Sequence, residues 1–224
     1  MNATPVLVFI SCVTAASFTR ANLVTNGDFE DPPVRNRING FDTYIGGESF
    51  GGWTVGGHSI DVVSDAKGSW VWWNAASGHQ SVDLNGLGAG SVWQDIATVP
   101  QQSYALSFAV AANIASAPWQ ATMEFLWHGQ VVDTICFHPT WNCYDPGWTY
   151  LAYQLTAETD QARLIFTSLS PGWTGGMILD DVCLQPLFEQ VPDTQSRWLS
   201  AALLLPLVLH RYGRPAGLRQ TPAC

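Results

Sequence analysis

The chain of 224 residues is rich in apolar residues (47%) and acidic overall, with 18 Asp and Glu against 9 Lys and Arg. That much buriable material excludes a disordered chain, and the length fits one domain with processing segments at its ends. Residues 22–190 keep four basic residues against seventeen acidic ones, a net charge of about −13. Such a domain would repel a phosphate backbone, so no nucleic acid is expected as a partner, while neutral sugars and cations remain open.

The N-terminal residues 1–21 are predicted to be a signal peptide. The apolar run "PVLVFISCVTAASF" is followed by Thr19 and Ala21, two small residues at positions −3 and −1 of a cleavage site before Asn22. The residues before the run lack Lys and Arg, and the alternative is a buried N-terminal strand. Cleavage predicts a secreted or cell-surface protein.

Between residues 22 and 190 the sequence predicts strands and no long helix. Short runs alternate apolar with polar or small residues, which is the period-two pattern of half-buried strands. His128-Gly129 between two runs predicts a two-residue hairpin turn. The ten expected strands are "WTVGG", "SIDVVS", "QSVDLNG", "SVWQDIATV", "YALSFAVAAN", "ATMEFLWHG", "QVVDTICF", "YLAYQLTA", "ARLIFTSLS" and "MILDDVCLQ". Strands at this spacing predict an all-β fold, an antiparallel two-sheet sandwich of jelly-roll type over residues 22–190.

Cysteine usage fits an exported protein. Cys136 and Cys143 lie close together in "CFHPTWNC" and are predicted to form a disulfide. A zinc site is the alternative, because His138 lies between them. Cys183 has no obvious mate in the domain and is expected to be a buried strand cysteine.

Two acidic motifs lie at the ends of the domain, "NLVTNGDFE" and "ILDDV". The first and last strands of a sandwich often lie side by side, which would bring Glu30 close to Asp180. Two carboxylates in one place need a shared proton or a cation, and Ca²⁺ accepts irregular sets of oxygen ligands. The alternative is that both acids are solvated residues or turn caps.

The C-terminal residues 191–224 are predicted to be a sorting or anchor-like segment. "VPDTQSRWLSAALLLPLVLHRYGR" has an apolar run from Trp198 to Leu209 that is too short to span a bilayer comfortably, and Pro206 interrupts it. A helical hairpin anchor with transient membrane association, or a processed tail, fits this pattern better than a transmembrane helix.

Eleven tryptophans are many for this length, and sugar rings pack their C–H faces on aromatic planes. Trp53, Trp93, Trp127 and Trp148 follow strand patterns and are expected in the core. The loop aromatics are candidate ligand residues because exposing an aromatic ring to water is unfavourable. Either a ligand covers such a ring, or the loop packs it on the domain itself. The candidate ligand-binding residues are Trp70, Trp72, Trp73, Asn74, Trp119, Trp141 and Trp173, with Gln80, Asp83, Asn85 and Asn113 as further polar groups that nothing in the sequence ranks.

No catalytic motif is found. The chain has no G-x-S-x-G elbow and no H-E-x-x-H helix, and its histidines are scattered. A glycosidase needs two carboxylates across a cleft, but seventeen acids make some pair inevitable and uninformative. We therefore expect a protein that is not an enzyme.

The ordered motifs "NGDFE", "GWTV", "SVDLNG", "TVPQQSYALSF" and "LDDV" resemble the choice-of-anchor C family of bacterial exported proteins. That family is similar to plant cell-wall proteins catalogued only by a domain of unknown function, and the resemblance covers Asn22 to Leu184. It implies a galactose-binding-like sandwich. It also implies a structural calcium held by Glu30 and Asp180, with a backbone carbonyl from the turn that ends at Gln80.

The C-terminal segment resembles a bacterial sorting signal of the Val-Pro-Asp type. It departs from that pattern at Gln195 and Pro206, and in the tail beyond Arg214. The leading hypothesis is an exported, non-catalytic module that binds a polysaccharide or other glycan at the cell surface or in the extracellular matrix. The alternatives are a structural or protein-binding envelope component and a divergent glycoside hydrolase.

Overall fold

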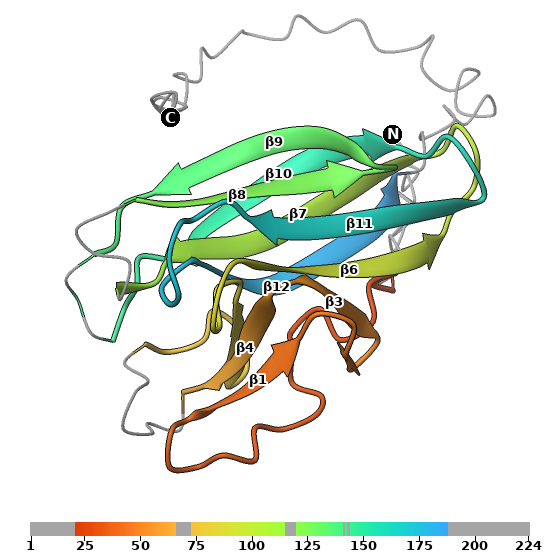
Figure 1. The fold of residues 1–224 in the computed structure, drawn as a ribbon. Helices are drawn as coiled ribbons and strands as arrows, with labels where there is room; N and C mark the ends of the chain where they lie inside the picture. The colour runs from red at the N-terminus through yellow and green to blue at the C-terminus, as the bar shows by residue number, and fades with distance from the viewer. Residues whose placement is uncertain (1–20, 66–72, 115–119, 141, 143, 188–224) are drawn as a thin grey trace, which may run out of the picture.

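The computed structural model describes residues 21–65, 73–114, 120–140, 142 and 144–187. These residues form two antiparallel sheets of six strands each (Figure 1). The predicted all-β antiparallel two-sheet sandwich is therefore confirmed. The C-terminal segment and the signal peptide, apart from Ala21, lie outside the described residues. No described helix is both long enough and apolar enough to cross a bilayer.

Each sheet mixes strands from both halves of the chain. Sheet A contains, in spatial order, β1 (Phe41–Ile45), β4 (Ser59–Ser64), β5 (Gln80–Asp83), β12 (Met177–Leu187), β7 (Ser103–Ala112) and β10 (Thr149–Thr156). Sheet B contains β2 (Ser49–Phe50), β3 (Trp53–Gly57), β6 (Gly90–Ala97), β11 (Gln161–Ser168), β8 (Ala121–Trp127) and β9 (Gln130–Phe137). All ten expected strands are present. The additional strand β2 has only two residues, and β1 has no buried position, so neither shows a clear alternation between a buried and an exposed side.

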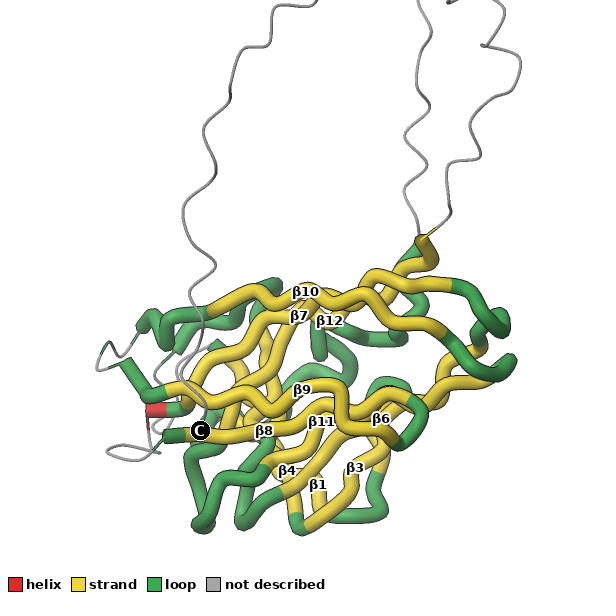
Figure 2. The backbone as a smooth tube through the Cα atoms, turned by 90° about the horizontal axis from the view of Figure 1, so that it is seen from above, coloured by secondary structure: helices red, strands yellow, loops and turns green. Residues whose placement is uncertain are grey.

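The core lies between the two layers seen in Figure 2, because alternate residues of every strand point inward. Phe108 of sheet A packs edge-on against two rings of sheet B, with centroids 5.4 Å from Phe125 and 5.0 Å from Phe166. Edge-to-face pairs of this kind add about 0.5–1.5 kcal/mol each beyond their buried area. Trp53 and Trp127 are buried, as expected from their strand patterns. The same expectation is wrong for Trp93, which is half-buried with the Arg163 guanidinium 3.8 Å from its ring centroid, and for Trp148, which is half-buried against a separate small cluster.

The predicted hairpin turn between β8 and β9 is confirmed. His128 and Gly129 both have positive φ, at 52° and 76°, and Trp127 pairs with Gln130. Positive φ at both central residues is the requirement of a type I′ turn, which matches the right-handed twist of the flanking strands.

Residues 22–30 form a turn rather than the expected strand, but they do lie beside β12. The Leu23 N–H donates to the Leu184 carbonyl at 2.9 Å, and the Val182 N–H donates to the Gly27 carbonyl at 2.8 Å. Phe29 is fully buried against Trp53, with ring centroids 5.4 Å apart. The expected strand was wrong because this segment places Phe29 in the core by turning, whereas the expected closeness of the two acidic motifs is confirmed.

A β-bulge interrupts β12. The register with β7 shifts between Asp180 and Cys183, and Asp181 adopts a positive φ of 49°. The inserted residue shifts the alternation by one position, so Asp180 points to the outer face of sheet A and Val182 points into the core.

The cysteines agree with the expected oxidised pair as far as the structure describes them. Cys136 is disulfide-bonded, which leaves no thiolate there for the zinc alternative. Its expected partner, Cys143, lies outside the described residues, so the pairing stays a prediction. Cys183 is a free, half-buried thiol.

Candidate functional site

The outer face of sheet A carries an unusual set of side chains. Because residues alternate along each strand, the neighbours of the core residues on β4, β5, β12, β7 and β10 point away from sheet B. A continuous row of directly paired residues crosses five strands of this face. From β1 to β7, the row consists of Thr43, Asp61, Asp83, Ile178 and Ala111.

Part of this face is covered by the chain that leads into β5. Trp73 is 8% exposed and packs with Val63, Ala111 and Ile178 in a small apolar cluster of its own. Its indole N–H donates to the Ser81 hydroxyl at 3.1 Å. For Trp73, the alternative that a loop aromatic packs on its own domain is therefore the one observed, because the outer face offers the ring an apolar patch.

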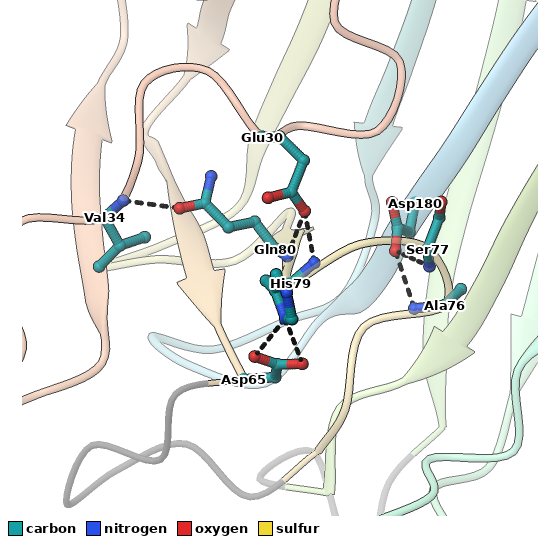
Figure 3. A network of polar contacts seen from close by, with 8 residues as sticks. All are labelled: Glu30, Val34, Asp65, Ala76, Ser77, His79, Gln80 and Asp180. Atoms are coloured by element: carbon teal, nitrogen blue, oxygen red, sulfur yellow. Dashed lines mark hydrogen bonds and ion pairs between the residues drawn. The ribbon is translucent and has the colours of Figure 1, made fainter.

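The turn formed by residues 76–80 lies between Glu30 and Asp180 (Figure 3). One oxygen of Glu30 accepts the N–H groups of His79 and Gln80, at 2.5 and 2.7 Å. One oxygen of Asp180 accepts those of Ala76 and Ser77, at 2.8 and 2.9 Å. The two acids predicted to converge therefore hold the same turn from opposite sides, each by pairs of backbone N–H donors.

Gln80 adds a third support to this turn. Its side-chain oxygen accepts the Val34 N–H at 2.6 Å (Figure 3). Its side-chain nitrogen donates to the Phe29 carbonyl at 2.6 Å. Gly78 is in the left-handed region at φ 59°, and a Cβ there would collide with the Glu30 carboxylate. The turn requires glycine because the carboxylate approaches the backbone so closely.

Asp180 is fully buried, and burial raises the pKa of its carboxyl from 3.8 to about 7. The N–H donors of Ser77, Asp181 and Ala76 oppose that rise by favouring the charged form. Arg163, one of three described arginines, is paired with Asp95 on the other sheet, and no described arginine bonds to Asp180.

Asp83 lies at the other end of the same face. Its carboxylate accepts the N–H groups of Asn85 and Gly176 and the Asn113 side-chain amide, the last at 2.6 Å. Burial raises its pKa from 3.8 to about 7, and that of the neighbouring Asp61 to about 6. The polar residues that the sequence could not rank, Asp83, Asn85 and Asn113, are thus joined in one buried network that anchors the loop entering β12.

Three described aromatic residues remain exposed at this face and its end loops, and one of them is Tyr144, whose backbone carbonyl accepts the Asn74 N–H. Tyr150 of β10 is 58% exposed and pairs with Ala109, which in turn pairs with Asp180. Trp173 is 82% exposed on the loop that ends at Gly176. Trp148 is half-buried against the cluster around Trp73 and donates its indole N–H to the Asn74 carbonyl at 2.9 Å.

The predicted ligand residues are only partly brought together. Asn74 is exposed beside Trp73, and Trp173 is exposed as expected. Trp70, Trp72, Trp119 and Trp141 lie outside the described residues. Sequence reasoning missed Tyr150, although the alternation of "YLAYQLTA" carries the signal: Leu151, Tyr153 and Leu155 point inward, so Tyr150 must point outward.

The ligand types around the turn 76–80 suit a hard cation. Carboxylate and carbonyl oxygens are what Ca²⁺ prefers. The second oxygen of Glu30 accepts no hydrogen bond from any described residue, whereas both oxygens of Asp180 already accept N–H groups. Within the described part of the chain, no three His, Cys, Asp or Glu side chains converge as a metal site. A calcium ion there would depend on backbone carbonyls for most of its ligands.

A family model described as "Protein of unknown function (DUF642)" matches residues 22–185. This agrees with the expected resemblance to proteins catalogued by a domain of unknown function. The choice-of-anchor C family and the sorting signal stay predictions. No curated protein matches the chain.

Several solved structures resemble the chain at low identity. A family 35 carbohydrate binding module from Clostridium thermocellum matches with a TM-score of 0.43 and 15% identity, over 64% of this chain and 97% of that one. TmCBM61, in complex with beta-1,4-galactotriose, gives 0.44 and 13%, over 75% and 99%. The CBM22-1 xylan-binding domain from Paenibacillus barcinonensis Xyn10C gives 0.41 and 16%, over 68% and 98%. The ligands named with these modules are those of the solved proteins, and the similarity concerns the fold alone.

Proposed function

The chain belongs to the DUF642 family, and for this member we propose a non-catalytic module that binds carbohydrate on the outer face of sheet A. The observation that carries the proposal is the exposed Tyr150 ring, which stands beside the small side chain of Ala109 on the outer face of sheet A. An exposed ring flanked by a small residue offers a flat apolar platform of the size of a sugar ring.

The polar surroundings of Tyr150 favour a ligand rich in hydroxyl groups. Asn74 is exposed nearby, and the Tyr150 hydroxyl lies 3.5 Å from the Ala76 carbonyl. The charged side chains of this face are acidic, so a sugar acid or a sulfated glycan would be repelled. A neutral polysaccharide is therefore the proposed partner.

The absence of catalysis is part of the proposal. Asp61 and Asp83, which are paired across β4 and β5, are the two carboxyls of the outer face that could be considered as a catalytic pair. Both are committed to hydrogen bonds within the protein, from Thr43 to Asp61 and from three donors to Asp83. A general acid or base must instead reach a substrate atom within hydrogen-bond distance.

A structural calcium ion is a second part of the proposal, with Glu30, Asp180 and a carbonyl of the turn ending at Gln80 as its ligands. What supports it is the buried carboxyl of Asp180, which faces no described cationic side chain. A divalent cation would offset the cost of burying that charge and would tie the N-terminal turn to β12.

Export is a third part of the proposal. It rests on residues 1–21 as a signal peptide, residues 191–224 as a sorting or anchor-like segment, and the disulfide at Cys136, which suits an oxidising compartment. The module would then act at the cell surface or in the extracellular matrix.

The proposal is tested by titrating the full chain with neutral hexasaccharides of glucose, mannose, galactose and xylose in a calorimeter. We expect one of them to bind, the Tyr150→Ala variant to lose most of the affinity, and Tyr150→Phe to retain it because the ring is kept. Absence of binding together with self-association would favour the structural alternative. Release of reducing ends from the matching polysaccharide would favour the hydrolase.

A further inference from the structure

We propose that a cleft beside β1 is a second saccharide subsite, at the edge of sheet A opposite to Tyr150. This inference goes beyond the outer-face site and can fail separately from it. The cleft has a volume of about 500 Å³. Its lining residues are Arg35, Asp42, Thr43, Tyr44, Glu48 and Ser49.

The cleft is built by the loop before β1 and by the β1–β2 connection, at the lower edge of Figure 1. Asp42 shapes the loop, since its two oxygens accept the N–H groups of Arg35 and Asn36 at 2.8 and 3.1 Å. Glu48 shapes the connection by accepting the Ile45 N–H at 2.8 Å. These hydrogen bonds hold the walls of the cleft in place and do not involve the Arg35 guanidinium, the Tyr44 hydroxyl or the second oxygen of Glu48.

Three of the lining groups lack a partner. The Arg35 guanidinium forms no ion pair or hydrogen bond with any described residue, and neither does the Tyr44 hydroxyl. Glu48 has a second oxygen that no described donor reaches. The Tyr44 ring packs on Phe50, with centroids 4.9 Å apart, which fixes its position at the side of the cleft.

These open groups select a class of ligand by charge. A phosphate or sulfate would face Asp42 and Glu48 and be repelled, while a cation would face Arg35. Sugar hydroxyls both donate and accept, so neighbouring hydroxyls can accept from a guanidinium and donate to a carboxylate. The Tyr44 ring adds the apolar surface that a sugar ring needs. The chemistry therefore fits a neutral polyhydroxyl ligand, namely a sugar unit of a glycan.

The position of the cleft gives the subsite a distinct role. β1 and β10 are the two edges of sheet A, separated by five strand spacings, or roughly 24 Å. Two weak subsites this far apart can both engage one polysaccharide, and binding at the first then raises the effective concentration of sugar at the second. A module of this kind would bind a polymer more tightly than a short oligosaccharide.

The test uses backbone amide NMR of the full chain with the same neutral hexasaccharides, and with sodium sulfate and calcium chloride as charged probes. We expect a hexasaccharide to shift the amides of residues 42–49 saturably. Arg35→Ala should weaken that response about tenfold or more, because a charged donor is lost. Arg35→Lys should weaken it less, because it keeps the charge but loses the planar fork. Val131→Ala, which removes an exposed apolar side chain of β9 on sheet B, should leave it unchanged.

The outcomes separate the two proposals. Shifts confined to the outer face, with residues 42–49 silent toward every hexasaccharide, would overturn the second subsite and leave the proposed function standing. Shifts of residues 42–49 by sulfate or calcium but by no sugar would overturn the assigned ligand class. Shifts of residues 42–49 that are unaffected by Arg35→Ala would overturn the role of the guanidinium, provided the variant keeps the wild-type melting temperature.

Discussion

Asp61 of β4 lies directly opposite Asp83 of β5 on the outer face of sheet A. Burial raises the pKa of both carboxyls, to about 6 for Asp61 and about 7 for Asp83, and the charge of Asp61 adds to the rise at Asp83. Two carboxyls so close in a region of low dielectric titrate as a pair, and the folded protein holds a proton between them to a higher pH than the unfolded chain does.

The pair predicts that the domain loses stability as pH rises from about 4 to about 7. In that window the unfolded carboxyls, with pKa near 3.8, have released their protons while the folded pair retains one, so raising the pH favours unfolding. The loss from Asp83 is on the order of 2–4 kcal/mol at most. Urea unfolding at several pH values measures the slope.

The Asp83→Asn variant is the matched test of that slope, because it removes the titration and keeps the size of the side chain. The Asn113 amide must then turn over, since it donates to the atom that becomes an amide nitrogen. We expect a flatter dependence of stability on pH. An unchanged slope would assign the pH dependence to other carboxyls.

Gly78→Ala should destabilise the domain more than Gly129→Ala. Both glycines have positive φ, at 59° and 76°, so both substitutions strain the backbone by on the order of 1 kcal/mol. Only Gly78 also meets a neighbour, the Glu30 carboxylate, whereas a Cβ at Gly129 meets open space. Chemical denaturation measures the free energy of unfolding of both variants, and the difference between their losses is the cost of the contact with Glu30. Equal losses would mean that Glu30 moves away freely.

Tyr153→Phe should cost about 1 kcal/mol of folding free energy. The Tyr153 hydroxyl of β10 donates to the Asp133 carboxylate of β9 at 2.8 Å, which joins the open edges of the two sheets. Burial and this bond raise the pKa of the phenol well above its usual range. Tyr150→Phe on the same strand is the control, because its hydroxyl makes only a 3.5 Å contact. Equal stabilities for the two variants would contradict a role in closing the edge.

The calcium proposal predicts that excess calcium raises the melting temperature of the full chain relative to EDTA. A ligand present at one hundred times its Kd stabilises by about 2.7 kcal/mol. Glu30→Gln and Asp180→Asn should abolish the rise, and Asp95→Asn on sheet B should keep it. The same melting temperature in calcium and EDTA would leave both acids as caps of the turn 76–80 only.

Trp173→Ala should weaken glycan binding by about 2–10-fold without changing the melting temperature. Its ring is 82% exposed, so the folded protein loses little packing, whereas a bound sugar would lose its stacking surface. Leu169→Ala removes an exposed apolar side chain of the same loop and should leave binding unchanged. A fall in stability with unchanged affinity would make Trp173 a structural residue.

Local patterns in the sequence were enough to predict most of the fold. The alternation at the start of "YALSFAVAAN" and along "ARLIFTSLS" predicted both the strand and its two faces, because side chains of a strand point alternately to opposite sides. The His128-Gly129 turn followed from the few residues that accept positive φ. The sequence alone also determined that the domain is acidic and that the acidic motifs at its two ends belong together.

Only the tertiary structure decided what those residues do. Trp73 was a candidate ligand residue whose packing the sequence left open, and it covers an apolar patch built by β4, β7 and β12. The direct pairing of Asp61 with Asp83 depends on which strands become neighbours. The cleft at Arg35 depends on how the loop before β1 folds against β1 and the β1–β2 connection. Burial, and the pKa shifts that it causes, are set by distant parts of the chain, and no local pattern of residues carries that information.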